Sequence, residues 1–189
     1  TNGYDSYEDR QNDFTNIVIT DFVKAENRIQ CNLIADCTRF ALGYNTIVNI
    51  DKIGNINGLE SLHLEANQIT IFNPSIALPN SLKYLFLNVN SIANFNPSIA
   101  LPSNLKTLDL RSNSIISFNP SLVLPSSLTT LNISSNDMTT SGYATSEAWA
   151  NAQPSFTSSC AVNLSSNIDS ASGTNLETIL TGKNCTVTT

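Results

Sequence analysis

Charged residues are scarce in this sequence, and positive charge is concentrated nowhere along it. Asp, Glu, Lys and Arg account for 13% of the 189 residues, and 9 Lys and Arg against 15 Asp and Glu give a formal net charge of −6. Binding to nucleic acid or to an anionic membrane surface needs clustered basic side chains that displace counterions. We therefore expect no nucleic-acid partner and no anionic membrane partner.

Long apolar runs are also missing. No stretch approaches the roughly 18 consecutive apolar residues that a spanning helix requires, so membrane insertion is not expected. The chain starts at Thr1 with neither a Met nor a charged-then-apolar leader, which indicates a mature product or an excised piece. Apolar residues still make up 41% of the chain, enough for a continuous core.

The side chains that usually carry catalysis or bind metals are few and scattered. His63 is the only histidine, and the four cysteines do not stand near it at the spacing of a zinc site. The sequence contains no phosphate-binding Gly loop, no GxSxG motif and no HExxH motif. We therefore predict a protein that is not an enzyme, with no catalytic residues, no metal and no cofactor.

What the sequence does contain is an internal repeat, whose shared letters are LxxLxLxxNxI, then FNPS, then LP. A repeat at a period of 20 to 50 residues indicates a solenoid, in which each copy is buried by its neighbours. One degenerate and five clear rungs cover residues 14–136. The rungs begin, at a spacing of 22 or 23 residues, at Phe14, Cys37, Leu59, Leu82, Leu105 and Leu128.

The repeated letters have a direct physical interpretation. The L-x-L alternation predicts a short strand with one face turned inward. The Asn-Pro of FNPS disfavours helix at the Asn and fixes the proline φ, so the return segment is expected to be extended or 3₁₀. Phe72, Phe95 and Phe118 are expected to stack on the wall opposite the strands.

One Asn follows each strand at the point where the chain must turn away. Its amide can bond to backbone groups of the turn and of the neighbouring rung, so successive copies are expected to form an Asn ladder. The predicted ladder consists of Asn45, Asn67, Asn90, Asn113 and Asn136.

This pattern resembles the leucine-rich-repeat family over residues 14–136, and the LPxSLxxLxLxxNxI arrangement looks most like short bacterial and phage repeats. The resemblance implies an α/β or mainly β solenoid. It would be a right-handed superhelix with a parallel concave sheet, a non-helical convex side, and partner contacts on the concave face.

Both ends depart from the repeat, as expected of segments that cap a solenoid. Residues 1–13 are polar and acidic and are interpreted as an N-terminal tail or cap. Residues 137–189 are interpreted as a C-terminal cap. Within it, a helical excursion around Trp149 precedes a renewed strand signature (VNLSSNI), a second helical segment around Leu180 and a final strand over residues 185–189.

The cysteines leave two questions open. Cys31 and Cys37 fall on core positions of the repeat, where they are either buried free thiols or a bridge to one another. Cys160 and Cys185 each precede a Val by two residues, so they are expected on adjacent strands, near disulfide range. A disulfide between them is possible on this spacing, and so are two free thiols.

Residues between and beside the core leucines are expected to face outward, and they vary from rung to rung. Phe86 and Tyr84 stand out, because aromatic side chains ringed by polar groups are typical of binding hot spots. The alternative is that Phe86 only packs on neighbouring strands. The predicted binding residues are Arg39, His63, Glu65, Tyr84, Phe86, Asn88, Thr107, Asp109, Arg111 and Asn132.

These observations favour a recognition module over an enzyme. The leading hypothesis is an adhesin, receptor-binding or decoration domain exposed on a bacterial surface or phage particle, with a protein or surface glycan as partner. One alternative is an assembly or spacer subunit that contacts other subunits of a larger particle. Another is the repeat domain of a bacterial effector that binds a host protein.

Overall fold

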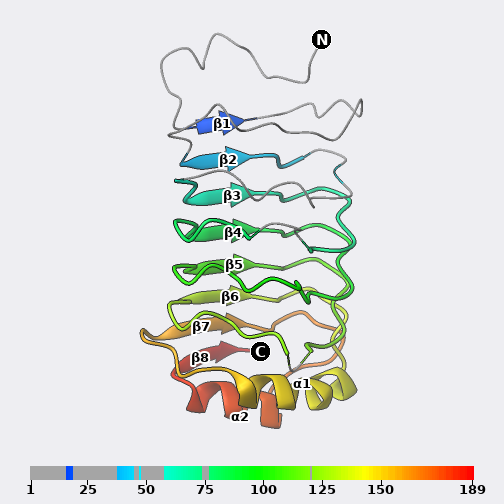
Figure 1. Cartoon of the computed structure of the whole chain (residues 1–189). Helices are drawn as coiled ribbons and strands as arrows, with labels where there is room; N and C mark the ends of the chain where they lie inside the picture. Colours follow the sequence, from blue (N-terminus) through cyan, green and yellow to red (C-terminus); the bar gives the residue numbers. More distant parts are fainter. Residues whose placement is uncertain (1–15, 19–37, 45–46, 48–57, 74–76, 120) are drawn as a thin grey trace.

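The computed structural model describes residues 16–18, 38–44, 47, 58–73, 77–119 and 121–189. Within these residues eight strands form one parallel sheet, in the same order in space as along the chain. Figure 1 shows them stacked one below another with slight curvature, so the sheet presents an open face rather than a deep concavity. The strands are β1 (Asn16–Val18), β2 (Arg39–Ala41), β3 (Ser61–His63), β4 (Tyr84–Phe86), β5 (Thr107–Asp109), β6 (Thr130–Asn132), β7 (Cys160–Asn163) and β8 (Cys185–Thr188).

The strand register follows the sequence repeat, so that equivalent letters lie side by side. Leu62 pairs with Leu85, and Leu85 pairs with Leu108. Because the register has no offset, the inward leucines form continuous columns that each rung shares with its neighbours. β1 pairs in parallel with β2, which places the degenerate first rung in the same sheet.

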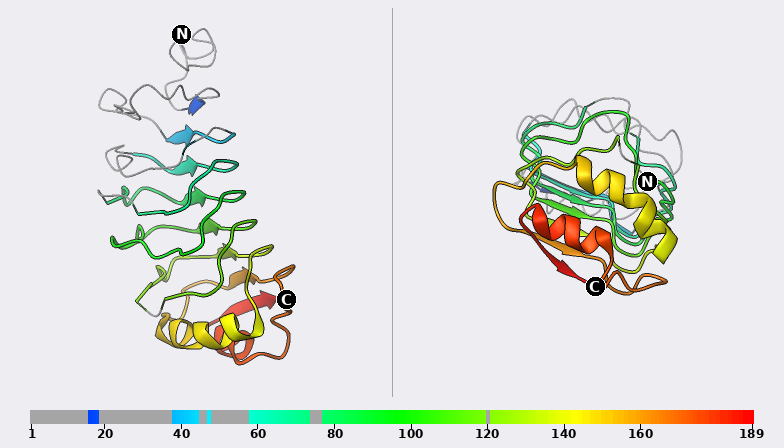
Figure 2. Two further views of the ribbon diagram at one scale, coloured as in Figure 1. Left: turned by 90° about the vertical axis from the view of Figure 1, so that its right-hand side faces the viewer. Right: turned by 90° about the horizontal axis from the view of Figure 1, so that it is seen from below.

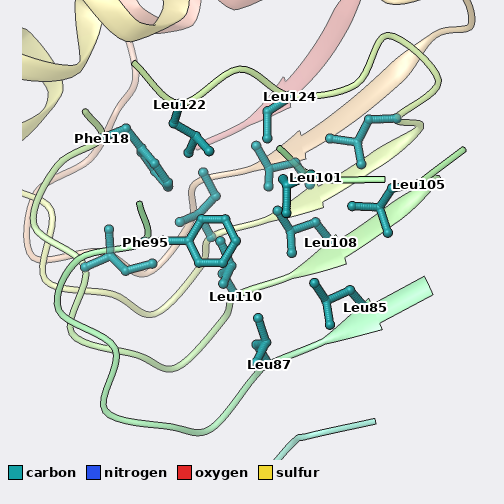
Figure 3. Packing of buried hydrophobic residues seen from close by; sticks show 14 of the residues in the cluster. Leu85, Leu87, Phe95, Leu101, Leu105, Leu108, Leu110, Phe118, Leu122 and Leu124 are labelled. Atoms are coloured by element: carbon teal, nitrogen blue, oxygen red, sulfur yellow. The ribbon is translucent and has the colours of Figure 1, made fainter. Parts of the chain in front are cut away.

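The core lies between the sheet and the return segments on the opposite wall. Figure 3 shows Leu85, Leu87, Leu108 and Leu110 pointing from the strands into this space, with Phe95 on the far side. The predicted back-wall stack is present, because the rings of Phe72 and Phe95 are stacked with centroids 5.5 Å apart. Between β3 and α1, the described return segments are extended or bent and contain no helix, as the Asn-Pro pairs predict.

The Asn ladder turns the chain out of each strand. The amide of Asn90 donates to the carbonyl oxygens of Leu64 and Leu87 at 3.0 Å each, and its Oδ1 accepts the backbone N–H of Ile69 at 2.9 Å. Equivalent bonds are made by Asn67, Asn113 and Asn136.

Asn167 extends the predicted ladder into the C-terminal cap, where its amide bonds to the carbonyl oxygens of Ile133 and Leu164. Asn45 lies outside the described residues.

The residue before each ladder Asn has a left-handed backbone. The φ angles in this row lie between 51° and 60° over Tyr44, Ala66, Val89, Ser112, Ser135 and Ser166. This conformation is uncommon for residues other than glycine, and it is a true outlier for a β-branched residue such as Val89. The ladder therefore imposes some backbone strain, most of it at Val89.

Two helices close the C-terminal end of the stack. α1 (Thr140–Ala152) is capped by Thr139 and α2 (Asn175–Gly182) by Thr174, whose hydroxyls accept backbone N–H bonds of the first turn. Figures 1 and 2 show both helices lying across the end beyond β8 and beside the last rungs. The helical excursion, the renewed strand, the second helix and the final strand that the sequence predicts are thus all present.

α1 takes the place of the extended return segment after β6, while β7 continues the sheet as the next strand. Trp149 is fully buried and stacks on Phe118 with ring centroids 4.6 Å apart, so it continues the back wall of phenylalanines. Gln153 accepts the N–H of Leu124 and donates to the carbonyl of Leu122, and Ser146 accepts the N–H of Phe118. These bonds satisfy backbone groups that a further repeat would otherwise bond.

Candidate functional site

The candidate site is the sheet face, defined here as the outward side chains of β2 to β7 and of the residue two positions after each strand. The strand register aligns these side chains in three rows. The first row is Arg39, Ser61, Tyr84, Thr107, Thr130 and Ala161. The second row is Ala41, His63, Phe86, Asp109, Asn132 and Asn163. The third row is Gly43, Glu65, Asn88, Arg111, Ser134 and Ser165.

An aromatic pair lies at the centre of this face. The rings of His63 and Phe86 stack with centroids 4.6 Å apart and planes inclined by 28°. Both side chains are only partly accessible, whereas Tyr84, on the same strand as Phe86, is exposed over 39% of its surface. Phe86 therefore packs on a neighbouring strand and also keeps part of its ring at the surface.

His63 is held by polar groups on its other sides. Its Nε2 accepts a hydrogen bond from Arg39 Nε at 3.2 Å and lies 2.9 Å from Ser61 Oγ. Its Nδ1 faces Glu65 Oε1 at 3.5 Å. The His63 ring thus lies between the Arg39 guanidinium and the Glu65 carboxylate.

Glu65 lies flat over the previous rung. A Cβ added at Gly43 would come within 2.8 Å of the Glu65 carboxyl carbon, so the glycine leaves the space that this side chain occupies. Burial raises the pKa of Glu65, but the hydrogen bond with His63, its backbone contact and the charges of His63 and Arg39 lower it more. The net pKa is below its ordinary value, so Glu65 is an anion that the fold stabilises.

Two rungs after Glu65, the side chain of Asp109 turns back toward the end of its own strand. Its carboxylate accepts the backbone N–H of Arg111 at 3.1 Å and contacts Arg111 Nε at 3.3 Å. Burial raises the pKa of Asp109, and the Arg111 N–H and charge oppose that rise without cancelling it. The Arg111 side chain remains 52% exposed, so its guanidinium is available at the surface.

The structure places the predicted binding residues unevenly. Tyr84 and Arg111 are exposed, and Asn88 and Asp109 are buried, at 8% and 7% exposure, although the sequence predicts both on the surface. The partly exposed remainder are Arg39, His63, Glu65, Phe86, Thr107 and Asn132.

A turn motif at the strand ends was not predicted. Asp109, Asn132 and Asn163 each accept the backbone N–H of the residue two positions later, at 3.0 to 3.1 Å. The residue types in the sequence are a signal for this motif, because Asp and Asn side chains at turns accept hydrogen bonds from the backbone N–H two residues later. These side chains therefore bond within their own turns, so they are weaker candidates for contacting a partner.

Basic side chains flank the face where the strands begin. Lys83 bonds to Glu60 across neighbouring rungs at 2.6 Å, and Lys106 is exposed one rung further on. Within the described part of residues 58–139, the basic residues are Lys83, Lys106 and Arg111, on the same rung as Tyr84 and Phe86 or on the next one. Lys83 and Arg111 are each paired with a carboxylate, of Glu60 and Asp109, so the margin of the aromatic centre carries charges of both signs.

The predicted neighbourhood of Cys160 and Cys185 is confirmed. The two residues are register partners on β7 and β8, and both carry free, buried thiols. Cys31 and Cys37 lie outside the described residues.

Two other kinds of site are lacking in the part of the chain that the structure describes. There, no three or more His, Cys, Asp and Glu side chains gather in a group that could hold a metal ion. Among the same residues, neither helix has the length and apolar character needed to cross a bilayer.

The stacked parallel rungs, the inward leucine columns and the open face define a class of solenoid that serves as a binding scaffold. Two family models, both described as leucine rich repeat, match residues 104–125 and residues 125–143. The matches identify leucine-rich repeats within this chain. A search of the curated proteins gives no match to it. Such repeats generally bind proteins and are typically non-enzymatic, so they indicate a protein-binding module.

Proposed function

We propose that this chain is a recognition domain, an adhesin or receptor-binding module exposed on a bacterial surface or phage particle, and that it contacts a protein through the sheet face. The observation that carries the proposal is the exposed Tyr84 beside the His63–Phe86 stack, with Arg111 and Lys106 at its margin. Aromatic and Arg side chains with a polar surround are the residues that dominate binding energy at protein interfaces.

Rigidity of the centre also supports this role. Phe86 is held by the His63 ring, and His63 is held by Arg39 and Ser61, so these side chains lose little rotamer freedom when a partner binds. A preorganised surface avoids part of the entropy cost of association. A protein partner that brings carboxylates would match Lys106 and Arg111.

The experiment compares three forms of the full chain on an array of extracellular and cell-surface proteins with a glycan array alongside. The test form is the double variant Tyr84→Ala, Phe86→Ala. The control is Ile71→Ala, Ile116→Ala, which removes side chains that are 66% and 55% exposed on the return segments.

We expect the wild type and the control to bind the same protein, and we expect the double variant not to bind that protein. If the control loses binding and the double variant keeps it, the contact lies on the return segments, and this result would favour an assembly role. Binding to glycans and to no protein would show that the partner is a sugar and would contradict a protein partner.

A further inference from the structure

The last two strands bring two sulfur atoms together inside the cap. Cys160 begins β7 and Cys185 begins β8, and they are direct partners in the parallel register. Both side chains point inward, with Cys160 fully buried and Cys185 6% exposed. The two thiols also form a hydrogen bond with one another.

This placement brings the two Cα atoms within the range that a disulfide spans. Neighbouring strands lie about 4.8 Å apart, and disulfides join Cα atoms separated by about 4.4 to 6.8 Å. Paired residues on parallel strands project to the same side of the sheet, so the two Cβ atoms point in the same direction. Because these Cβ atoms keep about the 4.8 Å strand spacing and a disulfide holds its Cβ atoms about 3.5 to 4.5 Å apart, closing the bond requires rotation of the side chains and a small shift of β8 toward β7.

The two thiols also differ in reactivity. The hydrogen bond from Cys160 lowers the pKa of the Cys185 thiol more than burial raises it. The pKa of Cys160 is raised, first by that same bond and then by burial. Cys185 is thus the better nucleophile of the pair, because the thiolate is the attacking form.

Cys185 is also the one that solvent reaches more easily. In the described sheet β8 is the last strand and pairs with β7 alone. A four-residue strand paired on one side opens more readily than the inner strands. Brief opening of β8 would admit a small oxidant to both sulfur atoms.

We propose that Cys160 and Cys185 are a disulfide-forming pair that covalently closes the C-terminal cap in the presence of a small-molecule disulfide oxidant. The Cys185 thiolate attacks one sulfur of the oxidant, forming a mixed disulfide and releasing one thiol. Cys160 then loses its proton and attacks Cys185 Sγ, which releases the second thiol. The protein gives up two electrons and two protons, and the oxidant is reduced to two thiols.

The bond would enclose residues 161–184, which include α2, and tie the final strand to the sheet. Closing such a loop restricts the unfolded chain, and in a solenoid the stability of a terminal unit supports its neighbour. The proposal does not depend on what the sheet face binds.

Peptide mapping tests it on the full wild-type chain. The folded protein is equilibrated with defined ratios of reduced and oxidised glutathione, alkylated and digested with trypsin. Trypsin cleaves after Lys183, so Cys160 lies in the peptide 112–183 and Cys185 lies in the peptide 184–189. Cys31 and Cys37 lie together in a third peptide, residues 29–39. A disulfide between the first two peptides is therefore distinct from any bridge between the other cysteines.

We expect the 112–183 and 184–189 peptides to be linked, and the oxidised chain to melt on the order of 5 °C above the reduced chain. Cys185→Ala and Cys160→Ala should show no rise in melting temperature on oxidation. Failure to link these peptides at every glutathione ratio would overturn the proposal, and this result needs no variant to fold. A linked wild type with no rise in melting temperature would overturn the claim that the bond closes the cap.

Discussion

Asn113 donates its side-chain amide to the carbonyl oxygen of Leu87 at 3.0 Å, from one rung of the solenoid to the rung before it. The same side chain bonds to the Leu110 carbonyl and accepts the N–H of Ile92. It also donates to the Arg111 carbonyl at 3.3 Å, so four backbone groups on two rungs depend on one buried amide.

We expect Asn113→Ala to lower the free energy of unfolding by about 3 kcal/mol, because it leaves buried backbone groups without partners. Urea unfolding followed by circular dichroism measures the change. Asn104→Ala is the matched control, because Asn104 is exposed and its side-chain amide donates to the Asn80 carbonyl at 2.8 Å. Similar losses for both variants would contradict the structural role of the ladder.

Two glycines in the cap helices should respond to alanine in opposite directions. A Cβ at Gly142 would overlap the carbonyl oxygen of Ile116, and nothing lies within 4 Å of one at Gly182. Alanine improves helix propensity by up to about 1 kcal/mol. At Gly142 we expect the overlap to outweigh this gain and to destabilise the fold by about 1 to 3 kcal/mol.

Gly182→Ala should be neutral or slightly stabilising. Thermal melts of the two variants against wild type provide the comparison. A Gly142→Ala variant as stable as Gly182→Ala would show that α1 does not lie against the Ile116 backbone as described.

The left-handed backbone at Val89 predicts a substitution that increases stability. Val89 has φ 57° and is half exposed, so its side chain gains little from burial while its branched Cβ opposes the conformation. Asn adopts this region far more readily. Val89→Asn should raise the free energy of unfolding by about 1 kcal/mol in the same urea assay, and a loss of stability would contradict the strain.

The contribution of Glu65 to the free energy of unfolding should decrease at acidic pH. Its pKa lies below the ordinary value of 4.5, so its stabilising effect is complete above that value and is lost as pH falls through the lowered pKa. The difference in unfolding free energy between wild type and Glu65→Gln should therefore shrink between about pH 6 and pH 3. A constant difference, or one that grows toward acid pH, would contradict the lowered pKa.

The regular part of the fold was predictable because one period controls both the core and the turns. Leu62, Leu85 and Leu108 share a column because they share a letter, and the ladder Asn follows from the same spacing. Trp149 as a continuation of the phenylalanine wall was not predicted, since α1 brings it there from outside the period.

The candidate site was predicted less completely than the core. Alternation along a strand predicts which side a residue faces, but the depth of burial depends on the side chains of the adjacent rungs. Asn88 and Asp109 face outward by position and are nevertheless covered. The stack of His63 on Phe86 likewise depends on ring orientations that spacing alone does not determine.

The measurement that tests the proposed recognition role most directly is the affinity of the captured protein partner for wild type and for Phe86→Ala, with unfolding curves recorded in parallel. Truncation removes an aromatic group at the centre of the sheet face while leaving the leucine columns in place. We predict at least a tenfold weaker Kd, equivalent to about 1.4 kcal/mol or more, with the variant still folded. An unchanged Kd in a folded Phe86→Ala protein would contradict recognition through this face.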